Sequence, residues 1–163
     1  MQNEINHLRE KAKEVKKENK KFLDRLKQRP PKKLDLLMQD LHEQTFQEVD
    51  CLACANCCKT TSPIITDRDI RRIAKHLRMK PANFEQQYLR IDEDNDFVYK
   101  GAPCPFLADD NYCLIYDVRP KACSEYPHTN RKSFHQLNKI TLANTAICPA
   151  TFRIIEKLKS KLS

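Results

Sequence analysis

Glycine and tryptophan are almost missing from this sequence of 163 residues, which has no Trp and a single Gly, Gly101. One glycine cannot build the phosphate loops of P-loop and dinucleotide-binding folds, which need several glycines where the backbone approaches the phosphate. A large sheet with many tight hairpin turns is disfavoured for a similar reason. The composition therefore excludes the common Gly-rich nucleotide sites.

Long hydrophobic runs are missing as well. The longest extend for about five residues, as at 51–55, whereas a membrane-spanning helix needs about 20. The N-terminus is charged and has no apolar stretch typical of a secretory signal. We therefore expect a soluble, cytoplasmic protein with no membrane partner.

The net charge of +8 is concentrated near the N-terminus. Residues 1–33 hold 12 Lys and Arg against 5 Asp and Glu, whereas residues 34–163 hold 18 against 17. In the first segment, apolar residues recur at spacings of three and four, which predicts one long helix ended by Pro30 and Pro31. The residues of this seam are Ile5, Leu8, Ala12, Val15, Phe22 and Leu26, with Asn19 in the gap.

This basic helix could bind nucleic acid by releasing counterions. However, it has no interleaved aromatic residues, and its acidic residues can form pairs four positions apart along the helix. We therefore expect it to pack on the rest of the protein or on a protein partner, and we do not favour nucleic acid as its ligand.

The remaining chain predicts an α+β fold that is mostly helical. Residues 1–33 are predicted to be a basic helical extension, and residues 34–163 a small domain organised around a cysteine-ligated metal centre. The prolines in 117–135 indicate an irregular loop. Apolar periodicity predicts helices at 34–50, 66–77, 83–89 and 150–162, and short strands at 97–99, 106–107, 114–116 and 140–142.

Cysteine is abundant in this sequence, and its thiol can bind metal or form disulfides. The eight cysteines are Cys51, Cys54, Cys57, Cys58, Cys104, Cys113, Cys123 and Cys148. Two cysteines separated by two residues can place both sulfurs on one side of a tight turn, and here two such steps follow one another. In a reducing compartment this pattern indicates metal ligands rather than disulfides. We predict that all eight cysteines are metal ligands.

Iron–sulfur and zinc centres are the two candidates for this metal. Structural zinc is often held by two Cys-x2-Cys pairs, but no second pair follows residue 58. Iron–sulfur ligands have looser spacing, and proline follows Cys104 and Cys148 as it follows a ligand in bacterial iron–sulfur runs. We favour iron–sulfur and keep zinc as the alternative. Because Cys57 and Cys58 are adjacent, either two centres share the eight cysteines or one of this pair is not a ligand.

Three other interpretations of the cysteines are weaker. Buried free thiols would need larger apolar neighbours than residues 51–58 provide. Disulfides would need an oxidising compartment. A thioredoxin-like redox pair would need its Cys-x2-Cys at the start of a helix that follows a strand, whereas here the run follows a predicted helix.

The cysteine segments resemble a known family. Residues 51–58 (CLACANCC), 104–107 (CPFL) and 113–127 (CLIYDVRPKACSEYP) closely resemble the YkgJ-type cysteine-cluster family, whose domain is described as zinc- or iron-chelating with a CxxCxxCC motif. The resemblance covers roughly residues 45–152. It implies metal chelation through these cysteines and implies no particular reaction.

Other polar residues near the cysteines have two interpretations each. Arg119 could donate hydrogen bonds to a thiolate or a bridging sulfide, or it could pair with Asp117 or Glu125 on the surface. His128 and His135 could replace a cysteine as a ligand, but we favour loop histidines that face water.

The leading functional hypothesis is a metal-binding protein that chelates iron, as an iron–sulfur cluster, or zinc. A second hypothesis is a metal-dependent enzyme or redox protein, which would need an open coordination position and a nearby acid, base or pocket. No catalytic constellation is identifiable beyond the cysteines. A third hypothesis is an interaction module in which the metal stabilises the fold and the basic helix recruits a partner.

Overall fold

The computed structural model describes residues 2–163 and divides them into two compact units. The helical unit joins the chain up to Cys51 with Pro127–Ser163, and the cysteine unit is Leu52–Tyr126. Most of the described chain is helical, as predicted, and its one regular sheet has two strands. The predicted domain boundary at residue 33 stays a prediction.

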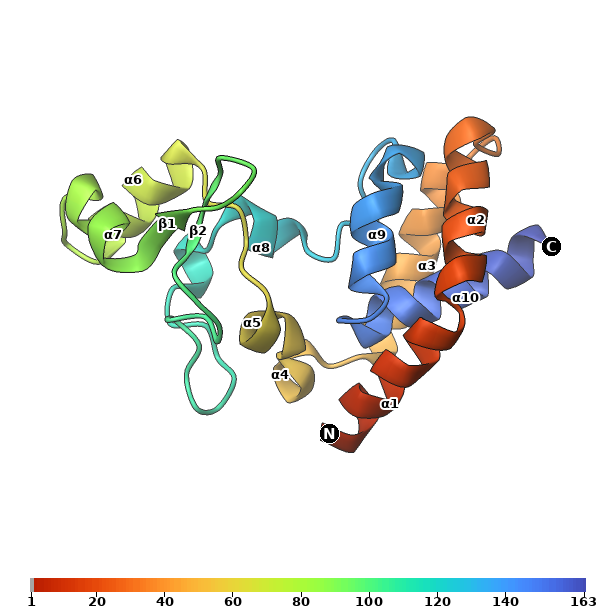
Figure 1. Cartoon of the computed structure of the whole chain (residues 1–163), viewed down its shortest axis with the longest axis horizontal. Helices are drawn as coiled ribbons and strands as arrows, with labels where there is room; N and C mark the ends of the chain where they lie inside the picture. The colour runs from red at the N-terminus through yellow and green to blue at the C-terminus, as the bar shows by residue number, and fades with distance from the viewer. Residues whose placement is uncertain (1) are drawn as a thin grey trace. The chain divides into compact units, whose positions relative to one another are not determined.

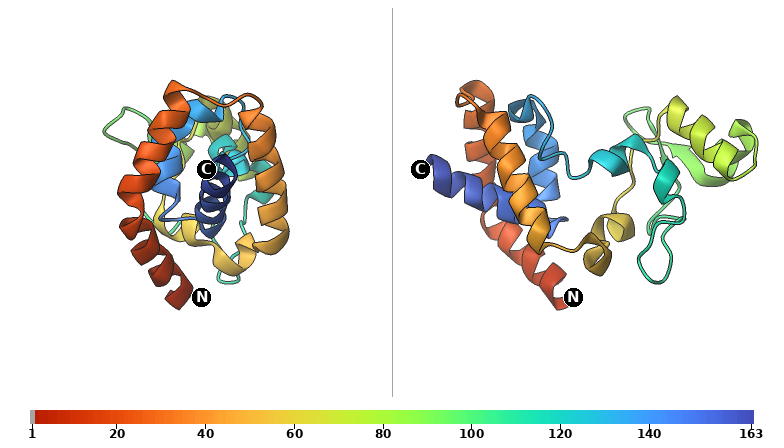
Figure 2. Two further views of the ribbon diagram at one scale, coloured as in Figure 1. Left: turned by 90° about the vertical axis from the view of Figure 1, so that its right-hand side faces the viewer. Right: turned by 180° about the vertical axis from the view of Figure 1, so that it is seen from behind.

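The helical unit is built from long helices that bury one apolar face each (Figure 1). Its elements are α1 (Gln2–Glu14), α2 (Lys16–Gln28), α3 (Leu34–Glu48), η2 (Phe134–Leu137), α9 (Asn138–Asn144) and α10 (Pro149–Leu162). Helix α3 and helix α10 confirm the predicted helices at 34–50 and 150–162. Figure 2, left, shows α10 between α2 and α3.

The single long helix predicted at the N-terminus is instead two helices that meet at Val15. Hydrogen bonds from Val15 N–H to the Lys11 carbonyl and from Asn19 N–H to the Val15 carbonyl span the junction at 3.1 and 2.8 Å. Helix α1 contacts α10, whereas α2 contacts α9. The chain bends because its two halves pack against different helices, which the periodicity of the seam could not indicate.

One core holds the helical unit together. It consists of Phe22, Leu23, Leu26, Leu34, Met38, Leu41, Phe134, Ile154, Ile155 and Leu158. Leu142 packs against this core from α9, where residues 140–142 had been predicted as a strand. That prediction is wrong because packing of α9 on α2 overrides the β-propensity of a short segment.

The cysteine unit contains shorter elements. They are α4 (Cys51–Cys54, which begins at the last residue of the helical unit), α5 (Asn56–Thr60), α6 (Asp67–His76), α7 (Pro81–Tyr88), β1 (Leu89–Ile91), β2 (Phe97–Tyr99), η1 (Tyr116–Val118) and α8 (Lys121–Glu125). Strands β1 and β2 are antiparallel, with Arg90 opposite Val98. Among the described residues, no helix is both long and apolar enough to cross a membrane.

Several of these elements follow from sequence signals. Helix α6 confirms the helix predicted at 66–77 and begins with a capping box: the Thr66 side chain accepts a hydrogen bond from the N–H of Asp69, and the Asp69 side chain accepts one from the N–H of Thr66. Helix α7 and strand β2 confirm the elements predicted at 83–89 and 97–99.

In place of the strands predicted at 106–107 and 114–116, the structure has a single bridge between Leu107 and Cys113. Tyr116 begins η1 rather than ending a strand. The predicted irregular loop at 117–135 contains α8, which is too short for its period to show in the sequence. The core of the cysteine unit is Ile65, Ile70, Ile73, Ala74, Phe84, Leu89, Tyr99, Phe106 and Ile115.

Asn19 lies in the core of the helical unit, fully buried, and neither polar atom of its side chain has a hydrogen-bond partner among residues 2–163. Asn19→Leu keeps the branched outline and removes two unsatisfied polar atoms. We expect the free energy of unfolding in urea to rise by about 1–2 kcal/mol. Asn3→Leu, at an exposed position of α1, should leave it unchanged. A loss of stability in Asn19→Leu would contradict the account of this core.

Candidate metal centre

The predicted ligands are divided between the two units. Cys51 and Cys148 belong to the helical unit, and the other six belong to the cysteine unit. Cys51 is exposed and the remaining seven are partly buried. All eight are placed as thiols, with no disulfide bond in the described chain.

The early cysteine run turns sharply between α4 and α5. Ala55, at the junction, is buried and has left-handed backbone angles, φ 46° and ψ 19°. A side chain in this conformation costs roughly 1–2 kcal/mol relative to the right-handed region. The turn separates Cys54, at the end of α4, from Cys57 and Cys58 on α5.

Two backbone contacts position the next two cysteines. The N–H of Cys104 donates a hydrogen bond to the carbonyl of Cys58 at 2.8 Å, so residue 104 lies beside α5. Cys113 is opposite Leu107 in the β-bridge. The chain around these residues thus returns to the early run from more than forty positions away.

Helix α6 holds the segment that carries Cys123. The Asp69 carboxylate, which is 1% exposed, accepts a hydrogen bond from the N–H of Lys121 at 3.1 Å. Arg72 pairs with the same carboxylate at 2.6 Å and donates to the carbonyl of Arg119 at 2.7 Å. These bonds fix the start of α8 and thereby the position of Cys123.

Four thiols in the cysteine unit interact electrostatically. The pKa of Cys123 is raised to about 12. Burial is the largest cause, and the charges of Cys58, Cys104 and Cys113 also contribute. Burial likewise raises the pKa of Cys104 to about 11, with contributions from Cys58 and Cys113. Burial and the charge of Cys58 also raise the pKa of Cys113. Cys58, Cys104, Cys113 and Cys123 therefore share one neighbourhood, and we call them the thiol cluster.

Cys58 differs from the other members of the thiol cluster. A hydrogen bond from the Cys57 thiol and the charge of Lys59 lower the pKa of Cys58 to about 7, against the effect of burial. Cys58 is thus the member of the cluster most easily ionised. Whether Cys57 and Cys58 both bind metal stays a prediction.

The thiol cluster is not drawn together to coordination distance. Within residues 2–163, no three Cys, His, Asp or Glu side chains are placed so that they could hold a metal ion. The predicted centre is therefore seen as four neighbouring thiols from separate segments.

Backbone N–H groups point at two sulfurs of the thiol cluster. The sulfur of Cys104 accepts hydrogen bonds from Phe106 and Leu107, and that of Cys113 accepts one from Ile115; each of these bonds lowers the pKa of its thiol. Such bonds stabilise a thiolate and are typical of metal-bound cysteine. Pro105 follows Cys104 directly and has no backbone N–H, so the donors are the next two residues, Phe106 and Leu107.

Tyr99 is a residue of this site that sequence reasoning missed. Its ring packs in the core with Phe106 at 5.7 Å between centroids, and Cys104 and Cys113 pack against the same core. The side chain is 1% exposed, and its hydroxyl has no hydrogen-bond partner in the described chain. Burial and the charges of Cys104, Cys123 and Cys113 raise its pKa.

A buried hydroxyl beside thiols, with no acceptor of its own, fits a site that holds a thiolate-ligated metal. It can donate to a thiolate or a bridging sulfide, whereas a neutral thiol is a weak acceptor. No sequence signal marks Tyr99, because its pattern is that of an ordinary strand residue.

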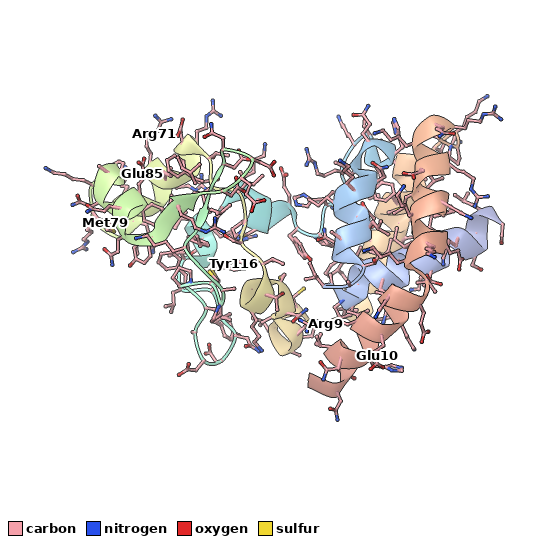
Figure 3. All side chains as sticks on the ribbon, in the orientation of Figure 1. Arg9, Glu10, Arg71, Met79, Glu85 and Tyr116 are labelled. Atoms are coloured by element: carbon pink, nitrogen blue, oxygen red, sulfur yellow. The ribbon has the colours of Figure 1, made fainter. Side chains whose placement is uncertain are left out.

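Arg119 lies near the cluster without a hydrogen bond to sulfur in the described contacts. It donates to the carbonyl of Tyr116 at 2.7 Å, and its guanidinium lies 4.0 Å from the centre of the exposed Tyr116 ring, which Figure 3 labels. Its charge lowers the pKa of Cys113 and Cys123. His128 belongs to the helical unit and is buried, so the prediction that it faces water is wrong.

These features define a class of protein that binds metal through cysteine thiolates. A family model confirms the class: it is described as CxxCxxCC, "Putative zinc- or iron-chelating domain", and matches residues 50–142. The chain belongs to this family. The matched range contains every predicted ligand except Cys148. No curated protein and no solved structure matches the chain.

The bonds to Asp69 predict how the site is supported. Burial opposes ionisation of Asp69, but hydrogen bonds from Thr66, Arg72 and Lys121 hold its pKa below the ordinary value. We expect Asp69→Ala to lower the free energy of unfolding by about 3 kcal/mol at pH 7, because the Arg72 guanidinium and the backbone N–H groups of Thr66 and Lys121 lose their acceptor. The exposed control Asp67→Ala should cost only about 0.5 kcal/mol.

The pH dependence of this effect has a definite sign. Because the pKa of Asp69 is lower in the folded state, its stabilisation is complete above the ordinary pKa of Asp and is lost as the pH falls through the folded value. The difference between wild type and Asp69→Ala in urea should therefore shrink below about pH 4. A difference that stays constant to pH 2.5, roughly, would contradict this role.

Proposed function

We propose that the cysteine unit binds iron as an iron–sulfur cluster, with Cys58, Cys104, Cys113 and Cys123 as its ligands. The observation that carries this proposal is the thiol cluster itself: four thiols from separate segments lie near enough for their charges to act on one another. Four cysteine ligands are the usual complement of such a cluster.

A cation explains why the chain gathers these groups. Four partly buried thiols that repel one another on ionisation are unfavourable as neighbours, and burial adds to the cost. A bound metal offsets both the repulsion and the cost of burial, because it compensates the negative charge and keeps the cysteines as thiolates. Its binding energy would then contribute to folding of the cysteine unit.

Two features favour iron–sulfur over zinc. The first is the spacing of the cysteines, which includes consecutive Cys-x2-Cys steps and a Cys-Pro at residue 104. The second is the set of donors near the site: the backbone N–H groups that lower the pKa of Cys104 and Cys113, and the buried Tyr99 hydroxyl, which has no acceptor in the described chain. Hydrogen bonds to sulfur set the potential of an iron–sulfur cluster, which supplies one-electron transfer when bound.

The other predicted ligands, Cys51, Cys54, Cys57 and Cys148, stay predictions. We place the protein in the cytoplasm, where thiols are kept reduced and available for metal. The family's description as zinc- or iron-chelating supports metal binding in either form.

Metal analysis of protein purified without oxygen tests the proposal. We expect iron with an equal amount of acid-labile sulfide, and a loss of most of both in Cys123→Ser, because serine is a poor ligand for iron. Ser124→Ala, the matched neighbour on α8, should keep the full amount. Zinc without sulfide would contradict the iron–sulfur assignment, and full metal content in Cys123→Ser would contradict the ligand set.

Tyr99→Phe should act in opposite directions on the two forms of the protein. In the metal-free form it removes an unsatisfied buried hydroxyl, so the free energy of unfolding should rise by about 1 kcal/mol. In the loaded form it removes a donor to sulfur, so resistance of the bound metal to chelator should fall by roughly 10–100-fold. Tyr112→Phe, at a residue 57% exposed, should change neither quantity. Equal effects on both forms would show that Tyr99 only packs.

A further inference from the structure

Helix α6 and the chain just after it expose a row of cations. We call this row the basic strip; it consists of Arg68, Arg71, Lys75, Arg78 and Lys80, all of which are exposed. In the described chain their side chains make no ion pair or hydrogen bond, unlike Arg72, which is committed to Asp69 and to backbone carbonyls. Figure 3 shows the side chain of Arg71 extending away from α6.

The basic strip stands out against the charge of its surroundings. The cysteine unit as a whole holds 11 Lys and Arg and 11 Asp and Glu, so its net charge is zero. Residues 67–80 hold six of these basic residues and two of the acidic ones. One of the two, Asp69, is buried and already bonded. The positive charge is therefore gathered on one segment, and the rest of the unit, with five basic and nine acidic residues, is net acidic.

The spacing of the strip suits a regular row of anions. Arg68, Arg71 and Lys75 are separated by three and four residues, which places them on one side of the helix over about 10 Å. Along one strand of a nucleic-acid duplex, phosphates follow one another every 3.4 Å of helix axis, so this length corresponds to about three phosphates. Arg78 and Lys80 extend the row past the helix end.

Arg78 is retained at a cost to stability. It has a left-handed backbone, φ 57°, at the position after the C-cap where glycine is preferred. Hydrogen bonds from Arg78 N–H to the Lys75 carbonyl and from Met79 N–H to the Ala74 carbonyl define a Schellman motif there. Arg78 therefore keeps its side chain in a strained conformation, as six other non-glycine residues of the described chain do.

We propose that the basic strip binds the phosphodiester backbone of nucleic acid. Guanidinium groups match phosphate oxygens in geometry, and three of the five residues are arginine. An anionic membrane fits less well, because the apolar face of α6, formed by Ile70, Ile73 and Ala74, is buried in the core and cannot insert into lipid.

The expected recognition is independent of base sequence. Residues 64–80 contain no Phe, Tyr or Trp on which a base could stack. This proposal concerns a different surface from the thiol cluster and does not rest on metal binding. It also concerns a different segment from residues 1–33, for which we did not favour nucleic acid as the ligand.

Fluorescence anisotropy of the full chain with a labelled 16-base-pair DNA duplex tests the proposal. If the five cations each contact a phosphate, affinity should fall by a few hundred-fold between 50 and 200 mM salt, since the logarithmic slope is roughly −0.9 per contact. Arg71→Gln/Lys75→Gln should weaken binding at least tenfold and reduce the slope by about two.

The matched control is Lys17→Gln/Lys21→Gln on α2, which removes the same charge at the same spacing from exposed positions of the helical unit. It should change affinity less than twofold. Equal loss in the two double variants would overturn the proposal, since binding would then follow net charge. So would no binding at low salt, or tighter binding to phosphatidylserine vesicles or polyglutamate than to the duplex.

Arg78→Gly separates binding from stability. Relief of the left-handed strain should raise Tm by about 2–4 °C. Loss of the guanidinium should weaken duplex binding several-fold in the same protein. A stabilised variant with unchanged affinity would contradict the place of Arg78 in the strip.

Discussion

Repulsion among four partly buried thiols is the constraint on which the cysteine unit depends. Cys104 and Cys123 have pKa values raised to about 11 and 12, so neither ionises readily by itself. Cys58, with a pKa of about 7, supplies the first negative charge, and that charge opposes ionisation of the others. Ionisation of all four thiols at neutral pH therefore needs a positive partner such as a metal ion.

The rest of the unit can be understood as support for these thiols. Helix α6 uses its buried face for the core, and Asp69 and Arg72 hold the start of α8. The Cys58 carbonyl accepts a hydrogen bond from Cys104 N–H, which ties the early run to the later cysteines. Tyr99 closes the site from the core with a hydroxyl that has no other acceptor in the described chain. The helical unit has a core of its own.

Sequence patterns predicted the elements whose signals are local. The apolar stripes of α3, α6 and α10 each repeat within a few residues, so those helices were found. The cysteine spacing and the family resemblance are also signals within short segments, and they indicated metal chelation. The N-terminal helix was predicted too long because its bend at Val15 depends on packing partners far along the chain.

The composition of the candidate site was harder to predict. Spacing alone treats all eight cysteines alike, whereas the fold brings Cys58 together with three distant ones. Tyr99 carries no motif, because its role arises from burial beside sulfur. The strand predicted at 140–142 failed for a related reason: local propensity was overridden by the packing of α9 on α2.

X-ray absorption at the metal edge of protein purified without oxygen tests the central claim most directly. The account predicts a first shell of sulfur at about 2.3 Å with four sulfurs around each metal. A second shell of iron should be present as well. A first shell made mainly of nitrogen or oxygen, or a folded protein that binds no metal, would contradict it.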